Sequence, residues 1–305
     1  MTTTMPRASA KNSTSVRSNA LPLPLRLLRG ALQGTAAVAP SAAERLSAEL
    51  FFRPLRARPA ALPDVGGFAV RRLDIASGGG TLAAWSWGEG PTVLLVHGWE
   101  GRARQMLPLV APLLAEGYRV VTFDMPAHGS SSGARVTVLD MARAIRDVAE
   151  AVTPLIGLHS SLRAVIAHSL GGAATALAIH QGLAVERAVL LAPAAEPEYF
   201  ARRVASMLGL SGRRAEGMVS RVLTELRADE PSIDVRTLAP SFSMPLLVLH
   251  DPADDDVPVA HGQGIAEAWP GGRFEATPGL GHRRILRDEG VLQRVSRFVA
   301  GVEDA

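Results

Sequence analysis

Two kinds of hydrophobic pattern alternate along most of this chain. Short apolar runs of four to eight residues are typical of buried strands. They occur at 68–75, 81–87, 92–96, 119–123, 162–167, 186–191, 245–250 and 273–277. Between them apolar residues return every three or four positions, as in amphipathic helices. These stretches are 103–116, 136–153, 171–181, 259–268 and 286–301. The alternation predicts an α/β fold with a mostly parallel central sheet and helices on both faces.

The alternation stops between residues 195 and 240. Two apolar stretches in this segment, 199–210 and 218–223, have helical spacing, and no strand pattern is present. We interpret the segment as a helical cap inserted between two strands. Its apolar faces pack on the core, line an acyl or alcohol pocket, or do both. Its arginines, Arg203 among them, are expected on a solvated surface.

Residues 1–63 form a separate region. Residues 1–20 are mostly polar, which predicts a disordered tail. Residues 21–63 contain two helical stretches, the second with Ser41 as its expected N-cap and Glu44 three positions later. This extension either packs on the domain at 64–305 or lies on a membrane surface as a basic amphipathic segment.

The charge of the chain is low and uneven. Its 305 residues are 47% hydrophobic and 20% charged, an ordinary globular balance. The sequence pI of about 10.1 exaggerates the basicity, because all but one of the 32 basic residues are Arg and little else titrates above neutral pH. Residues 1–63 carry a net charge of +7 and the remainder −4. A mildly acidic body argues against a nucleic-acid-binding protein.

Composition also bears on location. The chain has no Cys, which excludes disulfides, Cys-based zinc sites and a Cys nucleophile. No run of 18 uncharged apolar residues is present, so we expect no transmembrane helix. Residues 37–39 have the small-x-small form of a signal-peptide cleavage site, but Arg26 and Arg29 interrupt the apolar segment before them. We therefore expect a cytoplasmic protein, with a secreted or peripheral membrane location as alternatives.

The most informative segment for chemistry is residues 167–172, Ala-His-Ser-Leu-Gly-Gly. It follows an apolar strand and precedes a helix of small residues. A nucleophile elbow needs this context, because its sharp turn holds a Ser hydroxyl clear of the sheet. The positions two before and two after the Ser must be small, and Ala167 and Gly171 meet that requirement for Ser169. The alternative is a Gly-rich helix start with an N-cap Ser.

Four motifs, in order, resemble those of the α/β-hydrolase superfamily, and the resemblance covers residues 67–302. They are V-H-G-W-E-G at 96–101, D-M-P-A-H-G-S-S at 124–131, the elbow, and the pair formed by 254–258 and 279–282. Ala127 and Ala167 stand where the family has Gly. The resemblance implies an α/β-hydrolase fold with a short helical cap, and catalytic residues in the order Ser, acid, His.

A Ser hydroxyl needs an adjacent base to act as a nucleophile. His282 lies in a late Gly-rich loop before the last helix and is the candidate base for Ser169. By the family's D-x-x-V-P pattern the carboxylate that orients His282 is Asp254, while loop geometry keeps Asp251 as an alternative. The neighbouring Asp255 and Asp256 are expected to be solvated loop charges or turn formers.

The oxyanion of a tetrahedral intermediate needs preorganised donors. The backbone N–H of Leu170, directly after the candidate nucleophile, is one candidate. The resemblance implies the N–H of Trp99 as the second, which leaves the Trp99 side chain free to line the substrate pocket. Glu100 is expected to face solvent or to pair with Arg102 or Arg104.

The remaining histidines have structural interpretations. His97 and His128 are expected to satisfy backbone groups, and His250 is expected to be structural. Surface positions are expected for His159, His180 and His261. No metal-ligand spacing and no phosphate-binding loop is present, so we expect neither a metal nor another cofactor.

Together these features predict a serine hydrolase that cleaves a carboxylic ester or thioester through an acyl-Ser169 intermediate. The expected partner is a small-molecule substrate, and the oligomeric state stays open. Perhydrolysis, acyl transfer and C–C bond hydrolysis on the same triad are alternatives. So is a non-catalytic binding protein that kept the fold, which the intact Ser, Asp and His argue against.

Overall fold

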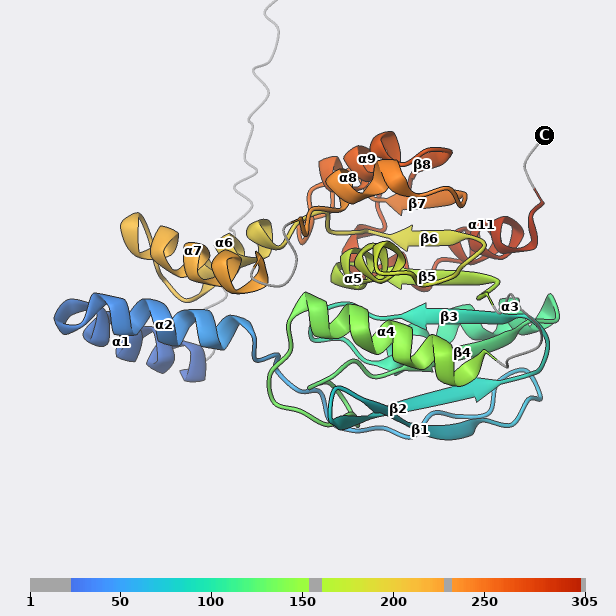
Figure 1. Cartoon of the computed structure of the whole chain (residues 1–305), viewed down its shortest axis with the longest axis horizontal. Helices are drawn as coiled ribbons and strands as arrows, with labels where there is room; N and C mark the ends of the chain where they lie inside the picture. Colours follow the sequence, from blue (N-terminus) through green and yellow to red (C-terminus); the bar gives the residue numbers. More distant parts are fainter. Residues whose placement is uncertain (1–22, 154–160, 228–231, 303–305) are drawn as a thin grey trace, which may run out of the picture.

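A twisted eight-stranded sheet forms the centre of the protein in the computed structural model, which describes residues 23–153, 161–227 and 232–302 (Figure 1). The strand order is β1-β2-β4-β3-β5-β6-β7-β8. Strands β3 to β8 run parallel, whereas β1 and β2 pair antiparallel and β2 pairs antiparallel with β4. The strands are β1 (Arg71–Ser77), β2 (Gly80–Trp87), β3 (Thr92–Val96), β4 (Arg119–Phe123), β5 (Ala164–His168), β6 (Ala188–Leu191), β7 (Leu246–His250) and β8 (Gly272–Ala276).

Helices cover both faces of the sheet. One face packs on α4 (Val138–Val152), α5 (Leu170–His180), α8 (Val235–Leu238) and α9 (Val259–Ala268). The other packs on the 3-10 helix η1 (Ala103–Leu109), α3 (Val110–Ala115) and α11 (Glu289–Ala300). A short 3-10 turn, η2 (Ala239–Ser241), leads into β7. The buried strands therefore have an apolar layer on each side, as the continuous apolar runs predict.

The sequence boundaries agree to within two residues for most elements and differ more at three places. The last helix begins at Glu289 rather than at residue 286, because Asp288 is its N-cap. The first strand begins at Arg71 rather than at residue 68, because Phe68 pairs with Val65 in a separate turn. The stretch expected as one helix at 103–116 is divided into η1 and α3. Pro108 lies at that division, and it has no backbone N–H to donate to an α-helical ladder.

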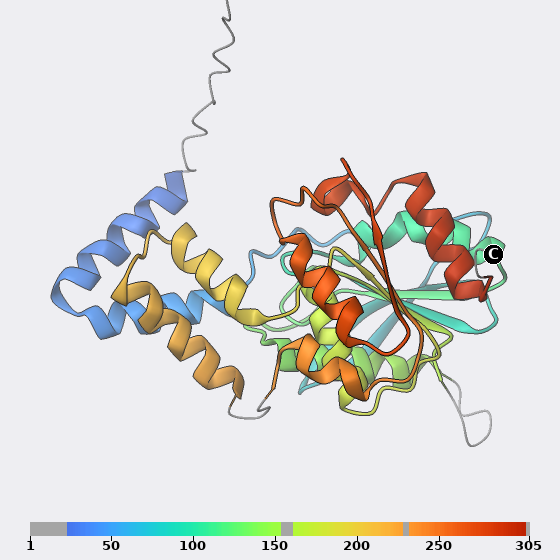
Figure 2. The ribbon, with the colours of Figure 1, turned by 90° about the horizontal axis from the view of Figure 1, so that it is seen from above.

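The N-terminal helices and the cap lie side by side at one end of the sheet (Figures 1 and 2). Helices α1 (Leu23–Val38) and α2 (Pro40–Phe51) pack against α6 (Pro197–Met207) and α7 (Arg213–Arg227). The Glu44 Oε2 atom lies 3.4 Å from the Nε atom of Arg221 on α7. A Cβ atom at Gly217 would lie 2.4 Å from the Glu44 carboxyl carbon, so only glycine allows this approach. The N-terminal extension therefore packs on the cap.

The second N-terminal helix does not start as expected. Helix α2 begins at Pro40, with Ala39 as its N-cap and no side-chain cap bond, so the expected Ser41 N-cap is wrong. Proline suits the first helical position, because its φ is preset and its missing N–H would be unpaired there in any case. The expected tail at 1–20 lies outside the described residues. None of the described helices combines the length and apolarity that a membrane span requires.

Candidate active site

Ser169 occupies a strained turn between β5 and α5. Its φ and ψ are 55° and −126°, a conformation that non-glycine residues rarely adopt. A Cβ atom at Gly171 would lie 2.5 Å from the His97 carbonyl oxygen, and one at Gly98 would lie 2.8 Å from the Ser169 Cβ atom. The turn thus has the backbone crowding that an elbow predicts, and the methyl group of Ala167 fits within the buried strand.

Asp254 and His282 form a direct contact. Asp254 follows β7, and His282 lies on the one-turn helix α10 (Gly281–Arg284) rather than in an open loop. The His282 Nδ1 atom is 2.8 Å from Asp254 Oδ2. Asp254 Oδ1 accepts hydrogen bonds from the backbone N–H groups of Asp256 and Val257, at 2.8 and 2.9 Å. The carboxylate is therefore fixed on one side and faces the imidazole on the other.

The environment keeps Asp254 ionised. Its side chain is fully buried, and burial acts to raise the pKa of this carboxyl group. The hydrogen bonds from His250 and His282 outweigh burial and hold the pKa of Asp254 well below its usual range. His250 contributes from the far side, since its Nε2 atom lies 3.4 Å from Asp254 Oδ2 and 3.0 Å from the Val257 carbonyl oxygen. His250 is buried and structural, as expected.

Asp251 serves the loop rather than the imidazole. It accepts hydrogen bonds from the backbone N–H groups of Ala253 and Gly281. Its carboxylate thus joins the loop after β7 to the start of α10, which places His282 opposite Asp254. The structure therefore brings Asp254, and not Asp251, to the ring of His282.

Asp256 and Arg203 are half-exposed rather than fully solvated, because they form an ion pair with each other. The Arg203 guanidinium on α6 lies 2.6 Å from Asp256 Oδ1, and its Nη1 atom donates to the backbone oxygens of Asp255 and Asp256. The Tyr199 hydroxyl also donates to the Asp256 carbonyl oxygen at 3.1 Å. The cap folds back over the acid loop, so these side chains tie the two together. Asp255 is exposed, as expected.

His168 links the nucleophile turn to His282. Its Nε2 atom lies 2.7 Å from the His282 carbonyl oxygen, and the two ring centroids are 4.6 Å apart. Among the described residues, the Ser169 hydroxyl makes no hydrogen bond to His282, which is common in active sites without substrate. Burial, reinforced by the nearby His282, lowers the pKa of His168 to about 3. In the sequence, the only sign of this contact was that His168 directly precedes Ser169 in the expected elbow.

The loop after β3 carries the second expected oxyanion donor. Neither the Trp99 nor the Leu170 backbone N–H donates to another described backbone group. The loop is held by His97 and His128, which accept hydrogen bonds from the backbone N–H groups of Met125 and Glu100, both at 3.0 Å. These two histidines satisfy backbone groups, as expected.

Glu100 and Trp99 contact the N-terminal extension. Glu100 is exposed, as the first of its two expected positions predicts, and its Oε1 atom accepts a hydrogen bond from the Leu55 backbone N–H at 3.2 Å. The alternative, a pairing with Arg102 or Arg104, is not among the ion pairs of the described residues. The Trp99 ring is stacked on Phe51, at a centroid distance of 6.1 Å and an interplanar angle of 18°. No local motif predicts these contacts, because they join segments more than 40 residues apart.

Surface positions were expected for three further histidines, His159, His180 and His261. His261 is buried, and its Nδ1 atom accepts a hydrogen bond from the Ala195 backbone N–H at 3.1 Å. The expected surface position of His261 is therefore wrong. His180 is exposed, as expected, and His159 lies outside the described residues. Within the described ranges, no group of three or more His, Cys, Asp or Glu is arranged to hold a metal ion.

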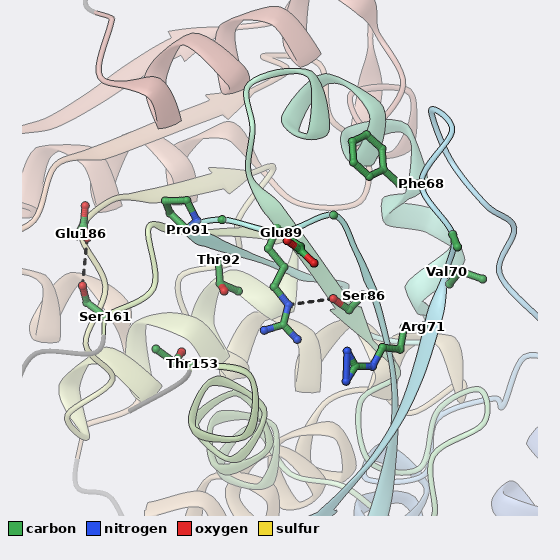
Figure 3. Close-up of a pocket in the computed structure, with 14 residues that line it drawn as sticks. Phe68, Val70, Arg71, Ser86, Glu89, Pro91, Thr92, Thr153, Ser161 and Glu186 are labelled. Atoms are coloured by element: carbon green, nitrogen blue, oxygen red, sulfur yellow. Dashed lines mark hydrogen bonds between the residues drawn. The ribbon is translucent and has the colours of Figure 1, made fainter. Parts of the chain in front are cut away.

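One cavity lies away from this site. It has a volume of about 1140 Å³, and its lining includes Glu89, Thr92 and Arg119 at the amino ends of the parallel strands (Figure 3). Ligands of open α/β sheets bind at the carboxyl ends instead. A smaller cavity of about 350 Å³ lies at that end, between the acid loop and α10, and His282 lines it.

Comparisons with known proteins bear on the family and the fold of the chain. The family model for serine aminopeptidase, S33, matches residues 90–234, just under half of the chain. A pyrethroid hydrolase from Sphingobium wenxiniae is 35% identical over 114 residues, which are 35% of this chain and 39% of that protein. A pimeloyl-(acyl-carrier protein) methyl ester esterase from Xanthomonas axonopodis pv. citri is 28% identical over 251 residues, 70% of this chain and 97% of that protein.

Solved structures show the same fold. The esterase Pf2001 from Pyrococcus furiosus superposes with a TM-score of 0.64 at 21% identity, over 82% of this chain and 97% of that one. Est1E from Butyrivibrio proteoclasticus, solved with ferulic acid, has a TM-score of 0.60 at 20% identity, over 75% and 96%. The fold, the family match and these relatives agree on the class: the chain is a hydrolase with the fold of the α/β-hydrolase superfamily. The expected fold class is confirmed.

Proposed function

We propose that this protein cleaves a carboxylic ester or thioester through an acyl-Ser169 intermediate. His282 takes the proton of the Ser169 hydroxyl as the oxygen attacks the carbonyl carbon, and later gives that proton to the leaving alcohol or thiol. Asp254 holds the imidazole in one tautomer and stabilises its charged form. Water, activated by His282, then releases the acid and restores Ser169.

The observation that carries the proposal is the contact of 2.8 Å between His282 Nδ1 and Asp254 Oδ2. Because Nδ1–H is donated to the carboxylate, Nε2 is left without a proton and can accept one. The carboxylate is buried and ionised, so it favours the imidazolium that forms during attack. The strained turn at Ser169 supports the nucleophile assignment, since such strain persists where the fold enforces it.

The backbone N–H groups of Trp99 and Leu170 are the proposed oxyanion hole. Leu170 opens α5, so its N–H lies at the positive end of the helix dipole. Such donors stabilise a developing oxyanion without reorganisation. The half-buried Trp99 ring is proposed to contact the substrate beside the reacting carbonyl group.

The ester class follows from the names of relatives, which include a methyl ester esterase and solved esterases. The match to the pyrethroid hydrolase spans only 39% of that protein, so its substrate is not carried over. A small-molecule ester or thioester is the proposed substrate. The cytoplasmic location expected from the sequence stays a prediction.

The test compares Ser169→Ala with Ser211→Ala, which replaces an exposed cap serine. Hydrolysis of p-nitrophenyl esters and acyl-CoA thioesters is measured together with covalent labelling by a fluorophosphonate. If the three residues act as a unit, Ser169→Ala lowers kcat by on the order of 10⁶ and abolishes labelling. Ser211→Ala should match the wild type. Near-normal hydrolysis by Ser169→Ala would exclude the mechanism.

A further inference from the structure

The end of α2 places an aromatic ring against the proposed oxyanion loop. Phe51 is the last residue of α2, and its ring is stacked on Trp99 at 6.1 Å between centroids. Both residues are only partly buried, so part of this aromatic pair is accessible to another apolar group. The N-terminal extension and the loop after β3 therefore share one aromatic surface.

This surface lies close to the nucleophile. Trp99 directly follows Gly98, where an added Cβ atom would lie 2.8 Å from the Ser169 Cβ atom. An acyl group bound to Ser169 with its oxygen on the Trp99 N–H would thus have the Trp99 ring beside it. Phe51, stacked on Trp99, adds a second apolar ring to this face, and it lies at the end of α2, the helix that packs on the cap helices.

The position of Phe51 is fixed by the residues around it. The adjacent Phe52 ring is buried beneath the Arg135 guanidinium, 4.3 Å from its centroid. The Phe52 carbonyl oxygen accepts a hydrogen bond from the Val136 N–H at 2.9 Å. Further along, the Arg56 side chain donates to three backbone oxygens of the loop at 127–133. A ring held this way can select substrates at little cost in conformational entropy.

We infer that Phe51 is a specificity-determining residue of the site, and that its ring binds the uncharged apolar chain of the ester. The inference rests on the proposed function. It assigns part of the active site to residues 40–56 of the N-terminal extension, which the sequence alone separates from the catalytic domain. The bound chain is the acyl group or the alcohol group, and both have the same apolar chemistry.

The experiment measures kcat/KM in two series, p-nitrophenyl esters of graded acyl length and acetate esters of graded alcohol length. Phe51→Ala should lower the ratio of kcat/KM for the six-carbon ester to that for the two-carbon ester about tenfold in one series. Phe51→Leu should keep most of the ratio, because it retains apolar contact. Leu46→Ala, on the exposed side of the same helix, should keep the wild-type ratio.

The ratio does not depend on the fraction of folded enzyme, since both esters are measured on one preparation. A ratio within twofold of wild type for Phe51→Ala in both series overturns this inference while the proposed function stands. So does an equal fall in Phe51→Ala and Leu46→Ala. Absence of ester hydrolysis by the wild type, with no labelling of Ser169, overturns both proposals.

Discussion

The Nε2 atom of His168 lies 2.7 Å from the carbonyl oxygen of His282. A carbonyl oxygen can only accept, so Nε2 carries the proton and the His168 ring is the donor. His168 is joined to Ser169 by a peptide bond, and His282 is the proposed base. One hydrogen bond therefore connects the end of β5 to α10 and sets how the two reacting side chains approach each other.

Replacing His168 should lower activity through position rather than through chemistry. We expect His168→Leu, which cannot donate, to reduce kcat by about 10- to 100-fold, since a small misplacement of a reacting group costs that much. KM should change little, because His168 does not contact the proposed substrate surface. His168→Gln keeps an N–H donor and should recover most of kcat. A His168→Leu variant within twofold of wild-type kcat would exclude this role.

Buried neutral histidines should make stability depend on pH. Burial is the main reason why the pKa of His97 and of His168 lies at about 3 rather than at the ordinary 6.5. Neighbouring histidines lower both pKa values further. In the unfolded chain both groups take up protons below about pH 6.5, whereas the folded protein does not. The free energy of unfolding is therefore highest above pH 6.5 and falls towards pH 3, by on the order of 1 kcal/mol per group and pH unit.

Thermal melts from pH 7.5 to pH 4.5 test this expectation. The wild-type Tm should fall steadily below pH 6.5. His168→Gln removes one of the titrating groups and should make the fall shallower. His180→Gln replaces an exposed histidine and should leave the slope unchanged. A flat wild-type Tm across this range would contradict the argument.

Replacing a glycine by alanine should lower kcat at Gly98 and raise stability at Gly30. At Gly98 an added methyl group would lie 2.8 Å from Ser169 Cβ and 3.0 Å from the His168 carbonyl oxygen, so the loop must shift. We expect Gly98→Ala to lower kcat by 100-fold or more, because the Trp99 N–H moves with the loop. At Gly30, within α1, the same methyl group has open space.

The matched variant Gly30→Ala should therefore raise the free energy of unfolding by about 0.5–1 kcal/mol, since alanine favours a helix over glycine. Urea unfolding and kcat, measured on both variants, check the pair. Unchanged activity in Gly98→Ala would mean that the loop relaxes without cost. A fall in stability in Gly30→Ala would mean that α1 is not a regular helix there.

The sequence predicted the elements that local patterns determine: the boundaries of β3, β4 and α9 follow from apolar runs and helical spacing. Motifs a few residues long singled out Asp254 and His282, which the structure brings into contact, while the catalytic roles of these two residues and of Ser169 stay predictions. The contacts of Phe51, Arg203 and His261 were not predicted. Each depends on a partner far away in the chain, and no spacing rule states which distant segment a side chain meets. The helical pattern of α2 indicated an apolar face but not that the cap covers it.

The packing of the extension on the cap also sets an order of events during synthesis. Glu44 meets Arg221, which is 177 residues later in the chain. At about 5–20 residues per second, a ribosome needs on the order of ten seconds or more to make that length. For all of this time the apolar faces of α1 and α2, including Leu32, lack their final cover. Helices α1 and α2 are thus made long before the cap helix that packs on them, and until then a nascent chain exposes their apolar faces to aggregation and to chaperones.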